Sequence, residues 1–253
     1  MTSLRLIFLL LGLSLLTALL WQADLSAIFD YVKHLGWGLA AVLAVYLAAF
    51  LADTLSWHLL IPSARLDRRW FYHLWKVRMV GASINRITPF VGLGGEPVKA
   101  VLLKKFHALD YREGVASLVV AKTANLIALI LYLSGGLAIT IISGDLPQAY
   151  QIASAMGLAV LAIGITVLFA VQRFKLTSAM SARLSRHRLG KRLVDILHHI
   201  EDMDERLVKS YTRDRKKFCL AVLLTLINWM LGMVEIYLIL LFLGHPVSMA
   251  EAW

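Results

Sequence analysis

The chain has 253 residues, of which 59% are hydrophobic and only 17% are charged, with a mean hydropathy of +0.72. This composition excludes an ordinary soluble domain and indicates an integral membrane protein. The net charge of +10 does not require a nucleic acid as partner, because a basic cytoplasmic face next to anionic lipid accounts for it. We predict an all-α polytopic transmembrane helical bundle, with residues 1–253 forming a single integral membrane domain.

Five apolar segments are long enough to cross a bilayer: residues 4–21, 36–61, 115–142, 148–171 and 218–243. The first has only Arg5 as a basic region and no small-residue cleavage site before Gln22. We therefore expect an uncleaved anchor rather than a signal peptide. A shorter apolar stripe in residues 25–35 predicts an interfacial helix.

Lysine and arginine gather in two stretches, with 10 in residues 61–113 and 13 in residues 172–217. The positive-inside tendency places both stretches, and with them the N-terminus, on the cytoplasmic side. Within the second stretch, apolar residues recur at helical spacing over residues 189–207. We predict that residues 172–217 form a basic cytoplasmic loop containing an amphipathic helix.

Residues 79–98 interrupt an apolar run with the sequence GASINRITPFVGLGGEP. Its prolines and glycines argue against a straight helix. Because both flanks are basic, the run should enter and leave the membrane on one side, as a re-entrant helical hairpin with its tip near the midplane. Irregular backbone at that depth must be buried in protein or line a polar cavity, so this hairpin is the best candidate for a binding site.

The stretch Gly94-Gly95-Glu96-Pro97 reads as a tight loop that feeds a helix beginning near Pro97. A helix start after glycines offers free N–H groups, and Lys99 adds a full positive charge, so the turn could cradle a phosphate. We expect Arg86 to neutralise Glu96 from across the hairpin. At Gly95 we expect a β-branched side chain to block close approach and to disfavour any positive backbone φ. The alternative is a structural ion network of Arg86, Glu96 and Lys99 that only keeps the hairpin folded.

Other polar side chains interrupt the predicted spans. Lys122, with Asn125 three residues later, suggests a cavity-lining role or a pairing with Glu96. Asp53 and Glu235 are candidates for a proton relay or for buried structural hydrogen bonds. Because isolated burial of an ionised group is costly, we predict that Arg86, Glu96, Lys99 and Lys122 line one shared polar cavity.

Signatures of hydrolases, nucleotide-binding loops and metal sites are missing from the sequence. The neighbouring His198 and His199 would point to different faces of a helix, so we expect no metal there and no cofactor. Whether the protein is an enzyme is left open, although the missing signatures argue against it. The single Cys219 cannot form an intrachain disulfide.

The pattern ASINRITPFVGLGGEPVKAVLLKK, followed by VVAKTANLIALI, resembles the flippase-like family related to the transmembrane region of lysylphosphatidylglycerol synthases. The last helix and turn, GMVEIYLILLFLGHPVS, look like those of membrane proteins associated with hopanoid biosynthesis. The resemblance implies a multi-pass protein of the bacterial inner membrane that moves a lipid or lipid-linked headgroup between leaflets. It also implies binding roles for the following positions: Asn85, Pro89, Gly94, Gly95, Glu96, Lys99 and the buried basic Lys122.

The lipids implied are anionic or of polyprenyl or hopanoid type, and a homo-oligomer or association with lipid-synthesis enzymes is left open. Two alternatives stand beside transport: a membrane-embedded lipid-modifying enzyme, with Glu96, Asp53 or Glu235 as general base, and an accessory or scaffold subunit of lipid biosynthesis. Relatives often carry an acidic residue where this chain has Ala121, so the partner of Lys122 is open. They also usually continue with further helices, so we expect the chain to be incomplete at its C-terminus.

Overall fold

The computed structural model describes residues 36–65, 67–87, 94–107, 109–144, 147–173 and 214–253, with single positions before residue 36. Within these residues the chain is all helical, without a strand, which confirms the predicted fold class. The predicted first span (residues 4–21), most of the stripe in residues 25–35 and the amphipathic helix of residues 189–207 lie outside the described residues. The described helices are α3 (Trp37–Leu59), α4 (Arg68–Ile87), α5 (Gly95–His107), α6 (Tyr111–Ser143), α7 (Gln148–Arg173), α10 (Arg215–Phe242) and α11 (Met249–Ala252).

Four of these helices, α3, α6, α7 and α10, are long and apolar enough to cross a membrane. They coincide with the second to fifth predicted spans, so the chain is a multi-pass membrane protein. Helix α6 has 33 residues, about 50 Å at the usual rise per residue, whereas the hydrocarbon core is about 30 Å thick. Its ends therefore extend beyond the hydrocarbon, or the helix is tilted within it.

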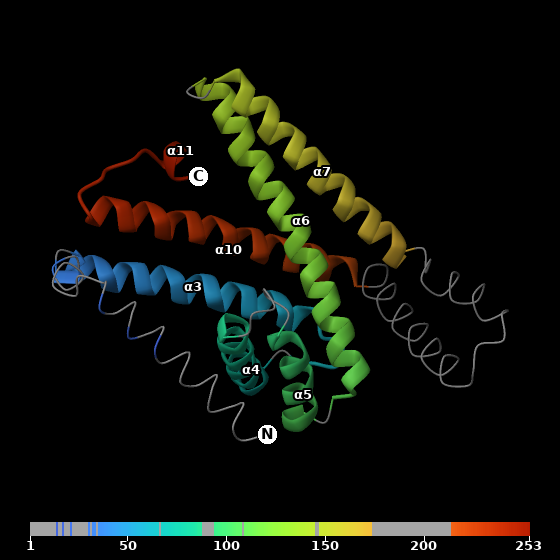
Figure 1. Cartoon of the computed structure of the whole chain (residues 1–253). Helices are drawn as coiled ribbons and strands as arrows, with labels where there is room; N and C mark the ends of the chain where they lie inside the picture. The colour runs from blue at the N-terminus through green and yellow to red at the C-terminus, as the bar shows by residue number, and fades with distance from the viewer. Residues whose placement is uncertain are drawn as a thin grey trace.

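Helices α3 and α10 run side by side in opposite directions, and α6 crosses them with α7 alongside it (Figure 1). A buried polar contact joins α3 to α10. The Ser56 hydroxyl donates to the Ala221 carbonyl at 2.9 Å and lies 2.9 Å from the Thr225 hydroxyl. Small residues and hydroxyl groups of this kind join helices in a membrane, where apolar side chains gain little by leaving lipid for each other.

Helices α4 and α5 pack against each other on the side of α3 opposite α10 (Figure 1). Helix α4 ends at Ile87 and α5 begins at Gly95, so the break in helical structure falls inside the predicted 79–98 segment. Residues 88–93, which include Pro89, lie outside the described part. Helix α4 begins at Arg68, earlier in the chain than residue 79, where the predicted hairpin begins. That the hairpin is re-entrant stays a prediction.

Glycine is required where the two arms of this hairpin touch. A Cβ at Gly95 would collide with the Gly81 carbonyl oxygen, and a Cβ at Gly81 would lie 2.5 Å from the Lys99 Cε. Gly95 does not have a positive φ, because the described glycines that do are Gly36, Gly144 and Gly244. Close approach of two backbones, not unusual backbone angles, explains this glycine.

The core beneath the hairpin joins α3, α4, α5 and the start of α6. Its apolar members are Trp57, Ile61, Leu74, Val77, Leu103 and Leu109. Aromatic and histidine rings continue this core towards the end of α5. Trp70 stacks on His107 with ring centroids 3.5 Å apart, and the His73 ring lies 5.2 Å from His107.

This ring cluster predicts a stability that depends on pH. Burial, followed by electrostatic repulsion from His73, lowers the pKa of His107 below 6.5, while Asp67 opposes the shift. The unfolded chain then binds this proton more readily than the folded one, so stability is complete above about pH 6.5 and falls as the pH drops below it. Melting temperatures between pH 7.5 and 5.5 should fall, and less steeply in His107→Phe, which keeps the stack but cannot titrate. The exposed control His245→Gln should follow the unmodified protein, and an unchanged slope in His107→Phe would contradict the assignment.

Candidate functional site

A polar cavity of about 180 Å³ lies where α3, α4, α5 and α6 meet. Each helix contributes at least one ionisable side chain to its wall: Asp53 from α3, Arg78 from α4, Glu96 and Lys99 from α5, and Lys122 from α6. Ser56, Trp57, Leu118, Ala121 and Asn125 complete the lining. Five ionisable groups around so small a volume are costly in a membrane protein unless they compensate one another or bind something.

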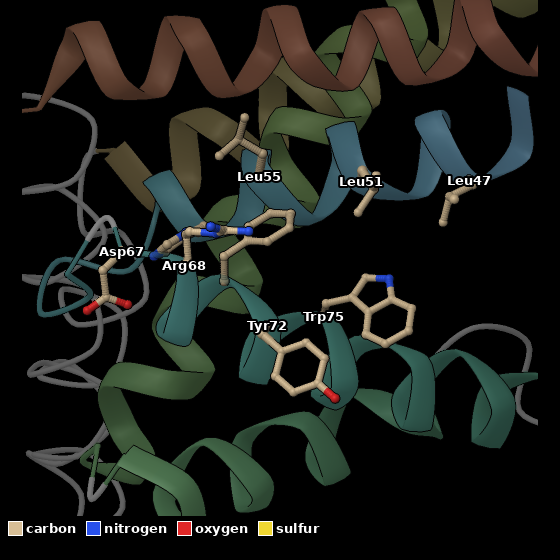
Figure 2. A pocket seen from close by; sticks show the side chains of 9 residues that line it. Leu47, Leu51, Leu55, Asp67, Arg68, Tyr72 and Trp75 are labelled. Atoms are coloured by element: carbon tan, nitrogen blue, oxygen red, sulfur yellow. The ribbon is translucent and has the colours of Figure 1, made fainter. Parts of the chain in front are cut away.

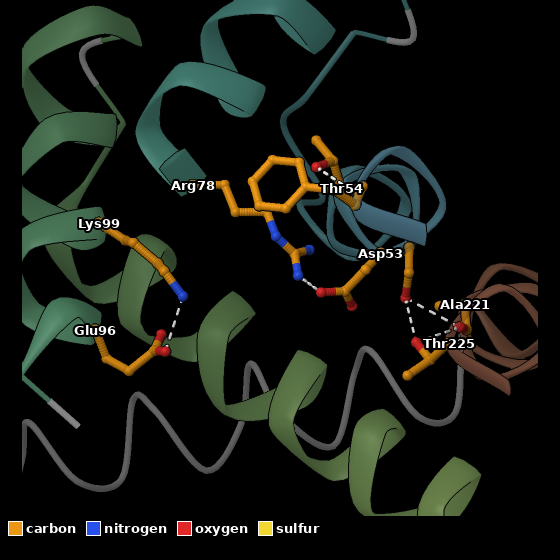
Figure 3. Close-up of polar contacts among 9 residues, drawn as sticks. Asp53, Thr54, Arg78, Glu96, Lys99, Ala221 and Thr225 are labelled. Atoms are coloured by element: carbon orange, nitrogen blue, oxygen red, sulfur yellow. Dashed lines mark hydrogen bonds and ion pairs between the residues drawn. The ribbon is translucent and has the colours of Figure 1, made fainter. Parts of the chain in front are cut away.

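Two ion pairs account for four of these five groups (Figure 3). Arg78 pairs with Asp53, and their side chains are only 18% and 21% exposed. Lys99 Nζ lies 2.8 Å from Glu96 Oε1. Lys122 makes no ion pair with any residue in the described part of the chain. It is exposed, so the buried position expected for this lysine is wrong. Three cations therefore face two carboxylates, which leaves the cavity with one net positive charge.

Aromatic rings hold two of the cations in place. The Arg78 guanidinium carbon lies 5.0 Å from the centroid of the Phe50 ring, and Lys99 Nζ lies 5.8 Å from that of Trp57. Trp57 is itself fixed, because its indole N–H donates to the Ser117 hydroxyl at 3.2 Å. Cations over aromatic faces gain electrostatic energy while staying partly desolvated. One cation of each ion pair in the cavity therefore lies over an aromatic ring of α3.

The start of α5 is less open to an anion than the sequence suggests. The Gly95 amide donates to Asn85 Oδ1 at 2.6 Å, so the end of α4 already caps α5. Glu96 adds a negative charge to the first turn of α5. Because these groups use and offset the positive end of the helix, the cavity's excess charge comes from side chains, chiefly Lys122.

The structure separates Arg86 from the site in which the sequence analysis placed it. Its guanidinium donates to the Tyr46 hydroxyl at 3.2 Å, and Arg86 does not line the cavity. The expected neutralisation of Glu96 by Arg86 is therefore wrong, because Lys99, one turn along the same helix, takes that role. Glu235 lies half-buried on α10 and is likewise not part of the cavity lining.

The other predicted residues fall in two places. Asp53, Glu96, Lys99, Lys122 and Asn125 share the cavity, whereas Asn85, Gly94 and Gly95 lie at the junction of α4 and α5. Their roles in binding stay predictions. Sequence reasoning missed Arg78, which it counted only as part of the basic flank. The available signal was Asp53, a carboxylate inside a predicted span that needs a cation close by.

Neither a curated protein nor a solved structure matches the chain. The model of one protein family does match, and it extends over residues 4–253. That range includes all four described spans, the α4–α5 hairpin and every residue of the polar cavity. This multi-pass membrane protein, with its charged cavity among apolar helices, therefore belongs to the family of the lysylphosphatidylglycerol synthase transmembrane region, a family related to phospholipid handling.

Proposed function

We propose that the polar cavity binds the anionic headgroup of a membrane lipid, and that the protein moves this lipid between the leaflets of a bacterial inner membrane. The observation that carries the proposal is the excess positive charge of the cavity, with Lys122 as the cation that has no carboxylate partner among the described residues. A phosphate or phosphodiester of the headgroup would supply the missing negative charge.

The cavity's size and composition suit a headgroup rather than a whole lipid. A volume of about 180 Å³ is smaller than the 300–1,000 Å³ typical of pockets that enclose a drug-sized ligand. Its polar lining would hold the phosphate, while the acyl chains would remain among the surrounding apolar helices. Such an arrangement lowers the main barrier to leaflet transfer, which is the cost of bringing a charge into hydrocarbon.

The paired state of the carboxylates favours transport over lipid modification. Asp53 and Glu96, two of the residues considered as general bases, are each held by a cation of the same cavity. Carboxylate oxygens that already face a cation of the cavity are not free to take a proton from a substrate. Neither a scaffold role nor an association with hopanoid synthesis would explain why the cavity is charged.

The test is a leaflet-transfer assay in proteoliposomes that contain fluorescent phosphatidylglycerol, with dithionite quenching of the outer leaflet. Lys122→Gln should slow protein-dependent transfer about ten-fold, because it removes a charged contact to the phosphate. Lys104→Gln is the matched control, since Lys104 is exposed on α5 and lies outside the cavity. It should transfer lipid at the unmodified rate.

Mass spectrometry of the recovered lipid distinguishes transfer from chemistry. The proposal expects transfer of chemically unchanged lipid. A chemically altered lipid, or equal transfer rates for Lys122→Gln and the unmodified protein, would overturn it.

A further inference from the structure

An apolar groove of about 710 Å³ lies between α3 and α4, apart from the polar cavity, and the two share no lining residue. On one side Leu47, Leu51 and Leu55 follow each other at helical spacing along α3 and are exposed. Tyr72 and Trp75 of α4 face them across the groove (Figure 2). The groove therefore offers a continuous apolar surface on a helix that can cross the membrane.

One end of the groove is charged. Asp67 and Arg68 line it there (Figure 2), and Arg65 and Arg69 add two more exposed cations next to them. Asp67 is already engaged, because its Oδ1 accepts the Trp70 amide at 2.6 Å at the start of α4. The end of the groove thus carries a net positive charge, with Arg68 as the cation that faces the apolar wall.

The length of the groove matches one leaflet. From Leu47 to His58, the last α3 residue that lines it, the helix rises about 16 Å, roughly half the thickness of the hydrocarbon core. A volume of about 710 Å³ also lies within the range of pockets that enclose most of a small ligand. An apolar trough of one leaflet's depth with a cationic end is complementary to an amphiphile that has an anionic head and a long chain.

We propose that this groove is a binding site for one anionic phospholipid, with an acyl chain along Leu47, Leu51 and Leu55 and its phosphate at Arg68. The site lies on the outer face of α3 and does not depend on transport through the polar cavity. The bound lipid belongs to the leaflet whose headgroups lie level with the C-terminal end of α3 and the basic N-terminal end of α4. Arginine suits this position because its planar group can bind two phosphate oxygens at once.

The experiment uses phosphatidylglycerol that carries a photoactivatable diazirine near the middle of one acyl chain. The purified full chain in nanodiscs is irradiated and the crosslinked peptides are mapped by mass spectrometry. We expect crosslinks to concentrate on residues 47–55 and 71–75. Leu51→Trp, which fills the groove, should reduce them about ten-fold because the chain loses most of its buried apolar contact.

Two matched controls separate the groove from the general lipid-facing surface. Leu43→Trp makes the same change on α3 at an exposed position outside the groove and should leave the crosslinks unchanged. Arg68→Glu should reduce labelling by phosphatidylglycerol and spare labelling by a diazirine probe of phosphatidylcholine, while Arg69→Glu should have a smaller effect on both.

Three results would overturn the proposal. The first is crosslinking spread evenly over the lipid-facing sides of α3, α6 and α7. The second is capture by Leu51→Cys, in a Cys219→Ser background, of a second copy of the chain. The third is capture by the same variant of residues 4–21, which would make the groove an internal packing surface. Unchanged leaflet transfer in Lys122→Gln, with groove labelling intact, would overturn only the function proposed for the cavity.

Discussion

Replacing Arg78 by alanine is expected to lower the free energy of unfolding by about 3–5 kcal/mol, the range measured when one partner of a buried ion pair is removed. Asp53 would then remain largely buried without its counter-charge, and the contact of the guanidinium with Phe50 would be lost as well. Reversible unfolding in mixed micelles by increasing SDS provides the measurement. Arg78→Lys should recover only part of the loss, because an ammonium cannot reproduce the planar contact of arginine with a carboxylate and a ring.

Two further variants decide whether the unpaired charge of Asp53 causes the loss of stability. Arg86→Ala removes the same side chain from the same helix, but among the described residues that arginine bonds only Tyr46, at an exposed site, so its cost should stay below about 1 kcal/mol. Adding Asp53→Asn to Arg78→Ala should restore part of the stability, since no charge is then left unpaired. A double variant as unstable as the sum of its single variants would contradict the ion-pair explanation.

Gly95→Val is the second change expected to have a large effect, with a loss of about 3 kcal/mol or failure to fold. The new side chain would collide with the Gly81 carbonyl and with Asn85 Oδ1, which lies 2.9 Å from the position of the added Cβ. The arms of the hairpin would have to separate, and Glu96 and Lys99 would leave the cavity with α5. Thermal unfolding monitored by circular dichroism in detergent measures the loss.

The control for this change is Gly157→Val on α7, where an added Cβ meets nothing within 4 Å. It should alter stability by less than about 1 kcal/mol, because only helix propensity changes. If both valine variants behave alike, the contact between Gly81 and Gly95 does not hold the hairpin together.

The spans and the helix break were predictable because their causes are local. A run of apolar residues must be helical in a membrane, and the glycines and prolines of residues 79–98 cannot continue a helix. The Glu96–Lys99 pair was also predictable, since its members are three positions apart on one helix face. The same local rule placed Lys122 and Asn125 side by side on α6, and both line the cavity.

Contacts between helices could not be predicted in this way. Asp53 needed a cation, but Arg78 and Arg86 lie about two turns apart on α4, and only the crossing of α3 and α4 selects Arg78. From the sequence, Arg86 was expected opposite Glu96 across the hairpin, and no partner was assigned to Asp53. The sequence did not predict the apolar groove either, since Leu47, Leu51 and Leu55 belong to a largely apolar helix with almost no hydrophobic periodicity to mark one face.

The most direct test of the central claim, that the polar cavity binds an anionic headgroup, is the affinity of the detergent-solubilised protein for short-chain dihexanoyl phosphatidylglycerol, measured by calorimetry per folded molecule. We predict saturable binding that weakens with added salt, because it depends on charge. The Kd should rise about ten-fold in Lys122→Gln and stay unchanged in Lys104→Gln. Equal affinity in Lys122→Gln and the unmodified protein, with both equally folded, would contradict the account.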